Sequence, residues 1–275
     1  MKKIKGLKIL DSKKPGPTLT IMAGVHGNEI CGITAFKKII NGIKIKKGKV
    51  YFILGNIKAI KKCSRQINFN LNRMFRLSSS LTKKQKESYE YKRSREIIPY
   101  LNQSIALLDI HSSLDKNSQP FIVCEKPIIK VAQYLSPKII TLGITKLEPG
   151  GTDGYMYNKK KIGICIECGY HKDPKASSVA IDAIYSFLSY FDMLKNKYPI
   201  IKTKKKIYEM ERIYLTKKDF VPNAKYGDFT PIKKGSVIGS DSNKKIIVKK
   251  NYITLFVFPK KEPDKEAFLL GNIIQ

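Results

Sequence analysis

The chain has 275 residues, of which 42% are hydrophobic, and its formal net charge is +31, from 53 Lys and Arg against 22 Asp and Glu. No run approaches the roughly 20 consecutive apolar residues of a membrane span, and residues 1–6 lack the apolar core of a signal peptide. We therefore expect a cytoplasmic protein with no membrane partner. The lysines are spread along the chain without interleaved aromatic residues, so we expect anionic substrates and no specific nucleic-acid partner.

Short apolar runs rich in β-branched residues alternate with segments of helical spacing over the first 194 residues. The runs predict buried strands over residues 19–25, 50–54, 105–110, 121–124, 138–144 and 162–166. The segments between them predict helices over residues 29–40, 81–101 and 177–194, the first capped by Asn28 and the second beginning at Thr82. This alternation indicates an α/β sheet covered by helices on both faces.

The pattern changes from about residue 200 to short alternating segments over 206–215, 236–239, 245–248 and 252–258, separated by turn signals. These predict a small β-rich domain. With a linker at residues 195–199, the predicted domains are 1–198 and 199–275.

His26 and Glu29 stand where the first long apolar run stops. At a spacing of three residues in one turn of chain, they supply two of the three ligands of a His₂Glu zinc site. The third ligand is either His111, which follows another predicted strand, or His171. The strand-end position favours His111, because sites in open α/β sheets assemble at that edge.

Two carboxylates accompany this set. Asp109 is two residues before His111, so in an extended strand it either orients that imidazole or caps a loop. Glu167 ends an otherwise apolar run, and a buried carboxylate without a partner costs several kcal/mol. Beside a zinc-bound water, Glu167 could act as the general base.

Residues 63–75 contain three asparagines and two arginines, Arg65 and Arg73, between apolar residues. Arginine suits the bidentate recognition of carboxylates, so we expect a polar clamp for the substrate here. The alternative is that Arg73 pairs with an internal acid.

The cysteines are expected to be reduced thiols that pack as small apolar side chains. Cys165 and Cys168 form the single CxxC spacing, but three residues apart in a strand they point to opposite faces and cannot share a metal.

The order of these motifs resembles the succinylglutamate desuccinylase/aspartoacylase family of zinc hydrolases, which is related in fold to the zinc metallocarboxypeptidases. The matching residues are His26-Gly27-Asn28-Glu29, Arg65, Asn72-Arg73-Met74-Phe75, His111 and Glu167. The resemblance implies an α/β fold with a mixed sheet covered by helices and a small C-terminal β domain.

The resemblance also implies a role for each residue. His26, Glu29 and His111 would bind one Zn²⁺ per chain. Glu167 would act as the base on the zinc-bound water and then protonate the leaving amine, and Arg65 would stabilise the developing oxyanion. In addition, Asn72 and Arg73 would hold a substrate carboxylate. The implied reaction is hydrolysis of an amide in a small anionic substrate such as an N-acyl amino acid.

Two departures from the family pattern bear on specificity. Asn70 replaces the usual aspartate, and no arginine aligns with the one that aspartoacylases carry shortly before the base. In its place, Thr152 and Asp153 either line the pocket or belong to a glycine-rich turn. A metallocarboxypeptidase and a non-catalytic basic protein that binds polyanions stand as alternative functions.

Overall fold

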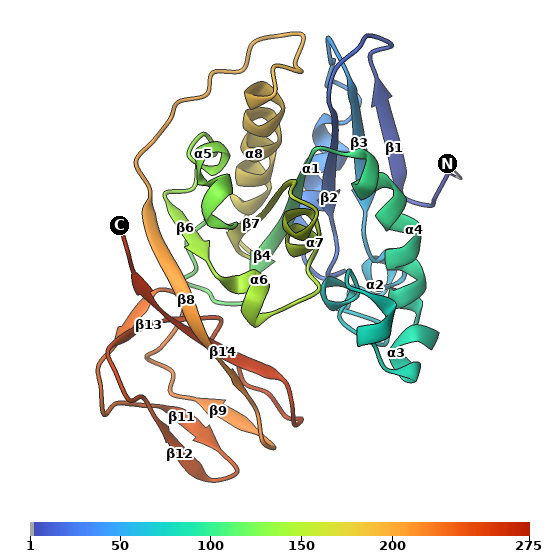
Figure 1. Ribbon diagram of the computed structural model, residues 1–275. Helices are drawn as coiled ribbons and strands as arrows, with labels where there is room; N and C mark the ends of the chain where they lie inside the picture. Colours follow the sequence, from blue (N-terminus) through green and yellow to red (C-terminus); the bar gives the residue numbers. More distant parts are fainter. Residues whose placement is uncertain (1–2) are drawn as a thin grey trace.

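The computed structural model describes residues 3–275 and has an α/β architecture with one dominant sheet (Figure 1). Eleven strands form this sheet in the order β1-β3-β2-β4-β7-β5-β6-β8-β14-β13-β10. The strands up to β7 are β1 (Leu7–Asp11), β2 (Thr18–Ala23), β3 (Lys49–Leu54), β4 (Ala106–Ser113), β5 (Phe121–Val123), β6 (Ile139–Leu142) and β7 (Ile162–Tyr170). Strands β2, β3, β4 and β7 run parallel, whereas β1 and β5 pair antiparallel with them. The sheet is therefore mixed, as expected.

Eight α-helices accompany the described part of the sheet: α1 (Cys31–Ile39), α2 (Ile57–Lys61), α3 (Lys83–Glu87), α4 (Tyr89–Gln103), α5 (Ile129–Ala132), α6 (Ile144–Leu147), α7 (Thr152–Asn158) and α8 (Ala176–Tyr190). Helices α1 and α8 pack in a core with Ile21 of β2, whereas α4 and α7 pack in a second core with Met22. Adjacent strand residues point to opposite faces. The fully apolar strands are thus buried on both sides, and the expectation of a sheet covered on both faces is confirmed.

Two local predictions about helices were wrong. Asn28 does not cap the first helix: α1 begins at Cys31, and the side chain of the residue before it, Ile30, makes no capping bond. The helix expected over residues 81–101 is two helices, because Ser88 ends α3 with extended dihedral angles and its hydroxyl caps the start of α4. Thr82 begins α3 with a complete capping box.

The C-terminal residues both extend the main sheet and form a second one. Strand β8 (Lys206–Leu215) pairs in parallel with β6, and β14 (Glu266–Ile273), β13 (Tyr252–Leu255) and β10 (Thr230–Ile232) continue the sheet antiparallel. Strands β9 (Phe220–Pro222), β11 (Val237–Asp241) and β12 (Lys244–Ile247) form the separate small sheet. Their core includes Phe220, Ile238 and Phe268. The division at residue 198 stays a prediction, since one sheet crosses it.

Among residues 3–275, no helix has the length and apolar character needed to cross a membrane.

Candidate metal centre and active site

The loop between β2 and α1 places His26 and Glu29 on one side of a tight turn, closed by a bond from the Glu29 N–H to the His26 carbonyl (3.2 Å). Gly27 makes this turn possible, because a Cβ there would lie 2.1 Å from the carbonyl carbon of Ala59 in α2. Only glycine lets the two backbones approach so closely. The close packing of this loop against α2 therefore explains why glycine stands between the two candidate ligands.

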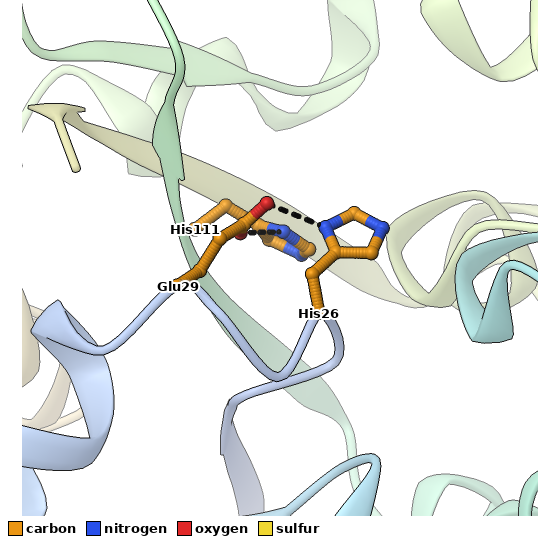
Figure 2. A group of neighbouring side chains, drawn as sticks. All are labelled: His26, Glu29 and His111. Atoms are coloured by element: carbon orange, nitrogen blue, oxygen red, sulfur yellow. Dashed lines mark hydrogen bonds and ion pairs between the residues drawn. The ribbon is translucent and has the colours of Figure 1, made fainter. Parts of the chain in front are cut away.

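His111 comes from β4 and completes a buried group with this pair (Figure 2). The two oxygens of Glu29 lie between the histidines, 2.7 Å from His26 Nδ1 and 2.9 Å from His111 Nδ1. The three side chains are at most 5% exposed, and their candidate ligand atoms all lie within 4.8 Å of one another. Two residues separated by 82 positions are thus brought into direct contact.

The outer ring nitrogens of both histidines face acceptors. His26 Nε2 lies 2.9 Å from Asn70 Oδ1, and His111 Nε2 lies 3.1 Å from Asp109 Oδ2, which also accepts a bond from the Thr152 hydroxyl (2.5 Å). With a metal ion held between the Nδ1 atoms and Glu29, these acceptors would suit rings that carry their protons on Nε2. Asp109 is therefore positioned to orient His111, as its spacing predicted, and Asn70 provides the same kind of oxygen for His26.

This donor set fits a zinc ion. Two imidazole nitrogens and one carboxylate are the ligands of the His₂Glu class of zinc sites. Burial, followed by the nearby Arg65 charge, lowers the pKa of His26 to about 4, which favours the neutral, metal-binding ring. The alternative third ligand, His171, lies outside the group, and its Nδ1 is 2.9 Å from the Ser112 hydroxyl.

Glu167 lies inside β7, which extends to residue 170, and it pairs directly with His111 across the parallel β4–β7 ladder. It is 8% exposed, and its Oε2 has no hydrogen-bond partner in the described structure. Burial and then the charge of Glu29 raise the pKa of Glu167 well above its usual range. A buried, partnerless carboxylate beside a candidate metal site has the properties of a functional group.

The loop that carries Arg65 is anchored by hydrogen bonds to Glu90, a fully buried residue of α4. The Glu90 carboxylate accepts the backbone N–H groups of Ile67 (2.8 Å), Asn68 (3.2 Å) and Phe69 (3.3 Å). Arg65 itself is 45% exposed, and its Nη1 lies 3.2 Å from Glu29 Oε1. Sequence reasoning missed Glu90, because a single glutamate on a helix gives no signal of its contacts.

Arg73 is paired with two internal acids. Its Nε and Nη2 donate to both oxygens of Glu266 from β14 (2.6 Å each), Nη2 also contacts Glu148, and Nη1 donates to the Asn72 carbonyl (2.8 Å). A guanidinium has five N–H groups, so one on Nη1 is left over. The predicted bidentate fork is thus occupied by Glu266, although the role of Arg73 in holding substrate stays a prediction.

Within residues 3–275, the side chain of Asn72 is hydrogen-bonded at its oxygen and not at its nitrogen. Its Oδ1 accepts the backbone N–H of Thr152 (3.1 Å), which leaves the amide nitrogen as a donor. One interpretation of the sequence placed Thr152 and Asp153 in a glycine-rich turn, and the structure contradicts it. They begin α7, and Asp153 lines the same pocket as the metal group.

The pocket is lined on one side by residues of the N-terminal part of the chain and on the other by residues of the C-terminal part. His26, Glu29, Arg65, Asn72, Arg73, His111, Asp153 and Glu167 line it from the N-terminal part, and Phe256, Phe258, Lys260 and Glu266 line it from the C-terminal part. Phe256 has φ +55°, an unusual angle for a bulky residue, and its N–H donates to Asp228 Oδ1 (2.9 Å). Sequence reasoning missed these C-terminal residues, because they belong to no recognisable motif.

Comparison with known proteins decides the family. The model of the family described as "Succinylglutamate desuccinylase/Aspartoacylase catalytic domain" matches residues 15–187, more than half of the chain. The chain belongs to this family.

Curated relatives of this family member include an N-acyl-aromatic-L-amino acid amidohydrolase (carboxylate-forming) of Rattus norvegicus, 27% identical over 58% of this chain and 54% of the relative. The aspartoacylase of Mus musculus is 34% identical over 31% of this chain and 29% of the relative. The chain thus spans about half or less of the curated relatives it matches. Succinylglutamate desuccinylase from Vibrio cholerae has a similar solved structure, with a TM-score of 0.77, 17% identity and coverage of 98% of this chain and 86% of that one. This likeness confirms the fold.

Proposed function

We propose that this protein is a zinc-dependent hydrolase that cleaves the amide bond of an N-acyl amino acid. The observation that carries the proposal is the buried group of His26, Glu29 and His111, with Glu167 beside it and a pocket above it. The names of the relatives, an N-acyl amino acid amidohydrolase and an aspartoacylase, support the removal of an acyl group from an amino acid.

His26, Glu29 and His111 would hold one Zn²⁺ per chain. When bound, zinc supplies a Lewis acid that lowers the pKa of water and leaves a position open for a reactant. Asn70 Oδ1 lies within hydrogen-bond distance of the outer nitrogen of His26, and Asp109 Oδ2 lies 3.1 Å from that of His111, so both are placed to orient the rings.

Glu167 acts as the general base and then as the general acid. Its carboxylate takes a proton from the attacking water and passes it to the amine nitrogen as the carbon–nitrogen bond breaks. The water oxygen ends in the released carboxylate. Arg65 reaches the same pocket with its guanidinium and donates to the oxyanion that develops on the scissile carbonyl.

Asn72 and Arg73 hold the carboxylate of the amino acid. The amide nitrogen of Asn72 and the one remaining N–H of Arg73 can both donate, while Glu148 and Glu266 fix the arginine in place. Lys260 lines the same pocket, and no ion pair of its side chain is present in the described structure, so it adds a positive charge for this carboxylate.

Metal analysis and activity together test the proposal. The full chain is assayed for zinc and for release of amine from Nα-acetyl amino acids, before and after chelation and zinc addition. We expect H26A to lose the metal, E167Q to keep the metal and lose activity, and E87Q, an exposed glutamate in α3, to match the wild type. Absence of stoichiometric metal together with absence of hydrolysis would overturn the proposal. If the protein instead released the C-terminal residue of a peptide and did not deacylate N-acyl amino acids, the proposed activity would be wrong and the protein would be a carboxypeptidase.

A further inference from the structure

Asp153 is a buried acid of the pocket that the proposed reaction does not use. It stands in the first turn of α7, is 8% exposed and lines the pocket next to Gly151 and Gly154. Its carboxylate accepts the backbone N–H groups of Gly154 and of Asp153 itself, but no ion pair of Asp153 is present among residues 3–275. A carboxylate held out of water without a cation is costly, so a ligand that brings a cation would be favoured.

The position of Asp153 relative to Asn72 can be read from Gly151. A Cβ on Gly151 would lie 2.6 Å from Asp153 Oδ1 and 3.7 Å from Asn72 Nδ2. Both side chains therefore surround the same point of the pocket wall. A substrate whose carboxylate is held by Asn72 would bring its amino-acid side chain close to the Asp153 carboxylate.

The arginines and the lysine of the pocket form no ion pair with Asp153 in the described structure. Four of the five N–H groups of Arg73 bond to Glu148, Glu266 and the Asn72 carbonyl, and Arg65 pairs with Glu29. Lys260 comes from the opposite, C-terminal wall, where the charges that act on it most strongly belong to Arg65, Glu266 and Glu148. Within the described structure, Asp153 therefore forms no ion pair with a lysine or arginine despite the net charge of +31 on the chain, although the charge of His111 acts to lower the pKa of its carboxyl.

We propose that Asp153 binds a positively charged group of the substrate, so that the enzyme prefers N-acyl amino acids whose side chain ends in an ammonium group. This inference rests on the proposed function and narrows its substrate class. A charge-assisted hydrogen bond to a buried carboxylate is stronger than a neutral one, and a site built around such a bond discriminates against a ligand that lacks the donor. We expect about a 10- to 100-fold preference in kcat/KM over a neutral side chain of equal length.

Matched pairs of substrates test this preference. Nα-acetyl-L-lysine is compared with Nα-acetyl-L-norleucine, and Nα-acetyl-L-ornithine with Nα-acetyl-L-norvaline, with Nα-acetyl-L-glutamate as the acidic member. The zinc-loaded full chain is assayed as wild type, D153N and D192N, the last an exposed aspartate whose carboxylate pairs with Lys46 and Lys47. We expect the basic compounds to be preferred by the wild type and D192N, and the basic-to-neutral ratio to fall toward one in D153N.

Two results would overturn the inference while leaving the proposed function intact. In the first, the wild type hydrolyses the neutral or acidic compounds at least as well as the basic ones. In the second, D153N lowers all five rates by the same factor, which is the result expected of a purely structural residue.

A binding measurement separates failure of the inference from failure of the proposed function. Calorimetry measures the affinity of L-lysine and L-norleucine, which are products of the proposed reaction, for the wild type and D153N. If nothing is hydrolysed but L-lysine binds more tightly than L-norleucine in the wild type alone, the proposed function fails and the cation site stands. If neither hydrolysis nor selective binding occurs, both are wrong.

Discussion

Two buried aspartates, one in the small C-terminal sheet and one in the pocket, have opposite surroundings. Asp241 is 2% exposed and accepts the backbone N–H groups of Lys217 (2.7 Å) and Lys218 (3.1 Å) and the Tyr214 hydroxyl (3.0 Å). Burial alone would raise the pKa of Asp241, but these backbone donors outweigh it and the pKa is lowered. Asp153, by contrast, has its pKa raised to about 6, because burial outweighs its backbone donors.

The difference separates structural from functional carboxylates. The oxygens of Asp241 are satisfied by the protein itself, so the acid holds a turn together and has nothing to offer a ligand. In the pocket, among the residues that the structure describes, Glu167 Oε2 has no hydrogen-bond partner and Asp153 forms no ion pair. Such groups cost stability, and active sites are where proteins tolerate that cost.

The largest effect is expected at Glu167. E167Q should lower kcat by about 10²- to 10⁴-fold, the usual contribution of a general base. Its free energy of unfolding should not fall, because an amide replaces a carboxylate that lacks a partner. Steady-state kinetics and urea unfolding, with zinc content as the control, measure both. If E167Q clearly lost free energy of unfolding but kept its activity, Glu167 would be a structural acid like Asp241.

Asp241 should show the reverse behaviour. D241A removes an acceptor for several N–H groups at once and should reduce the free energy of unfolding by about 3 kcal/mol. Because residue 241 lies outside the pocket, kcat per folded molecule should not change. Denaturant unfolding and active-site titration check this, and D241N, which keeps one oxygen, should lose less stability. An unchanged unfolding midpoint in D241A would break the comparison.

The pH dependence of stability should distinguish the two aspartates by sign. The pKa of Asp153 is about 6 in the fold, against 3.8 for a free side chain. Between about pH 4 and pH 6 the unfolded chain therefore binds fewer protons than the native one, and stability falls as pH rises. Relative to D153N, the wild type should lose about 2 kcal/mol over this window, then stay level.

Asp241, whose pKa is lowered, stabilises the fold above the ordinary pKa of 3.8, and this stabilisation is lost only as pH falls below that value. Unfolding free energies of the wild type, D153N and D241N from pH 3 to pH 8 provide the measurement. Parallel curves for the wild type and D153N would show that the Asp153 environment is not destabilising.

The smallest effect is expected at Asn70, whose Oδ1 lies 2.9 Å from His26 Nε2. N70A should weaken zinc binding about tenfold, as loss of an orienting partner does at other metal sites. N70D keeps an acceptor and should stay within about threefold of the wild type. Competition with a zinc chelator measures both. A strong loss in N70D would show that the neutrality of Asn70, and not only its oxygen, is needed.

Several site residues could be predicted because they are encoded locally. The turn of His26 and Glu29 and the alternation that puts Asp109 beside His111 depend on neighbouring residues, and both contacts are present. The contacts of Arg73 could not be assigned in this way. Glu148 and Glu266 are 75 and 193 residues away from it, and no periodicity connects them.

The sequence by itself determined the α/β alternation, the family and the residues available for a metal, because these depend on local patterns and on short motifs. Only the tertiary structure decided which acids have partners. Residues brought together by the sheet determine whether a carboxylate is satisfied, as at Asp241, or left over, as at Glu167 and Asp153. That distinction depends on long-range packing and desolvation, which no stretch of sequence contains.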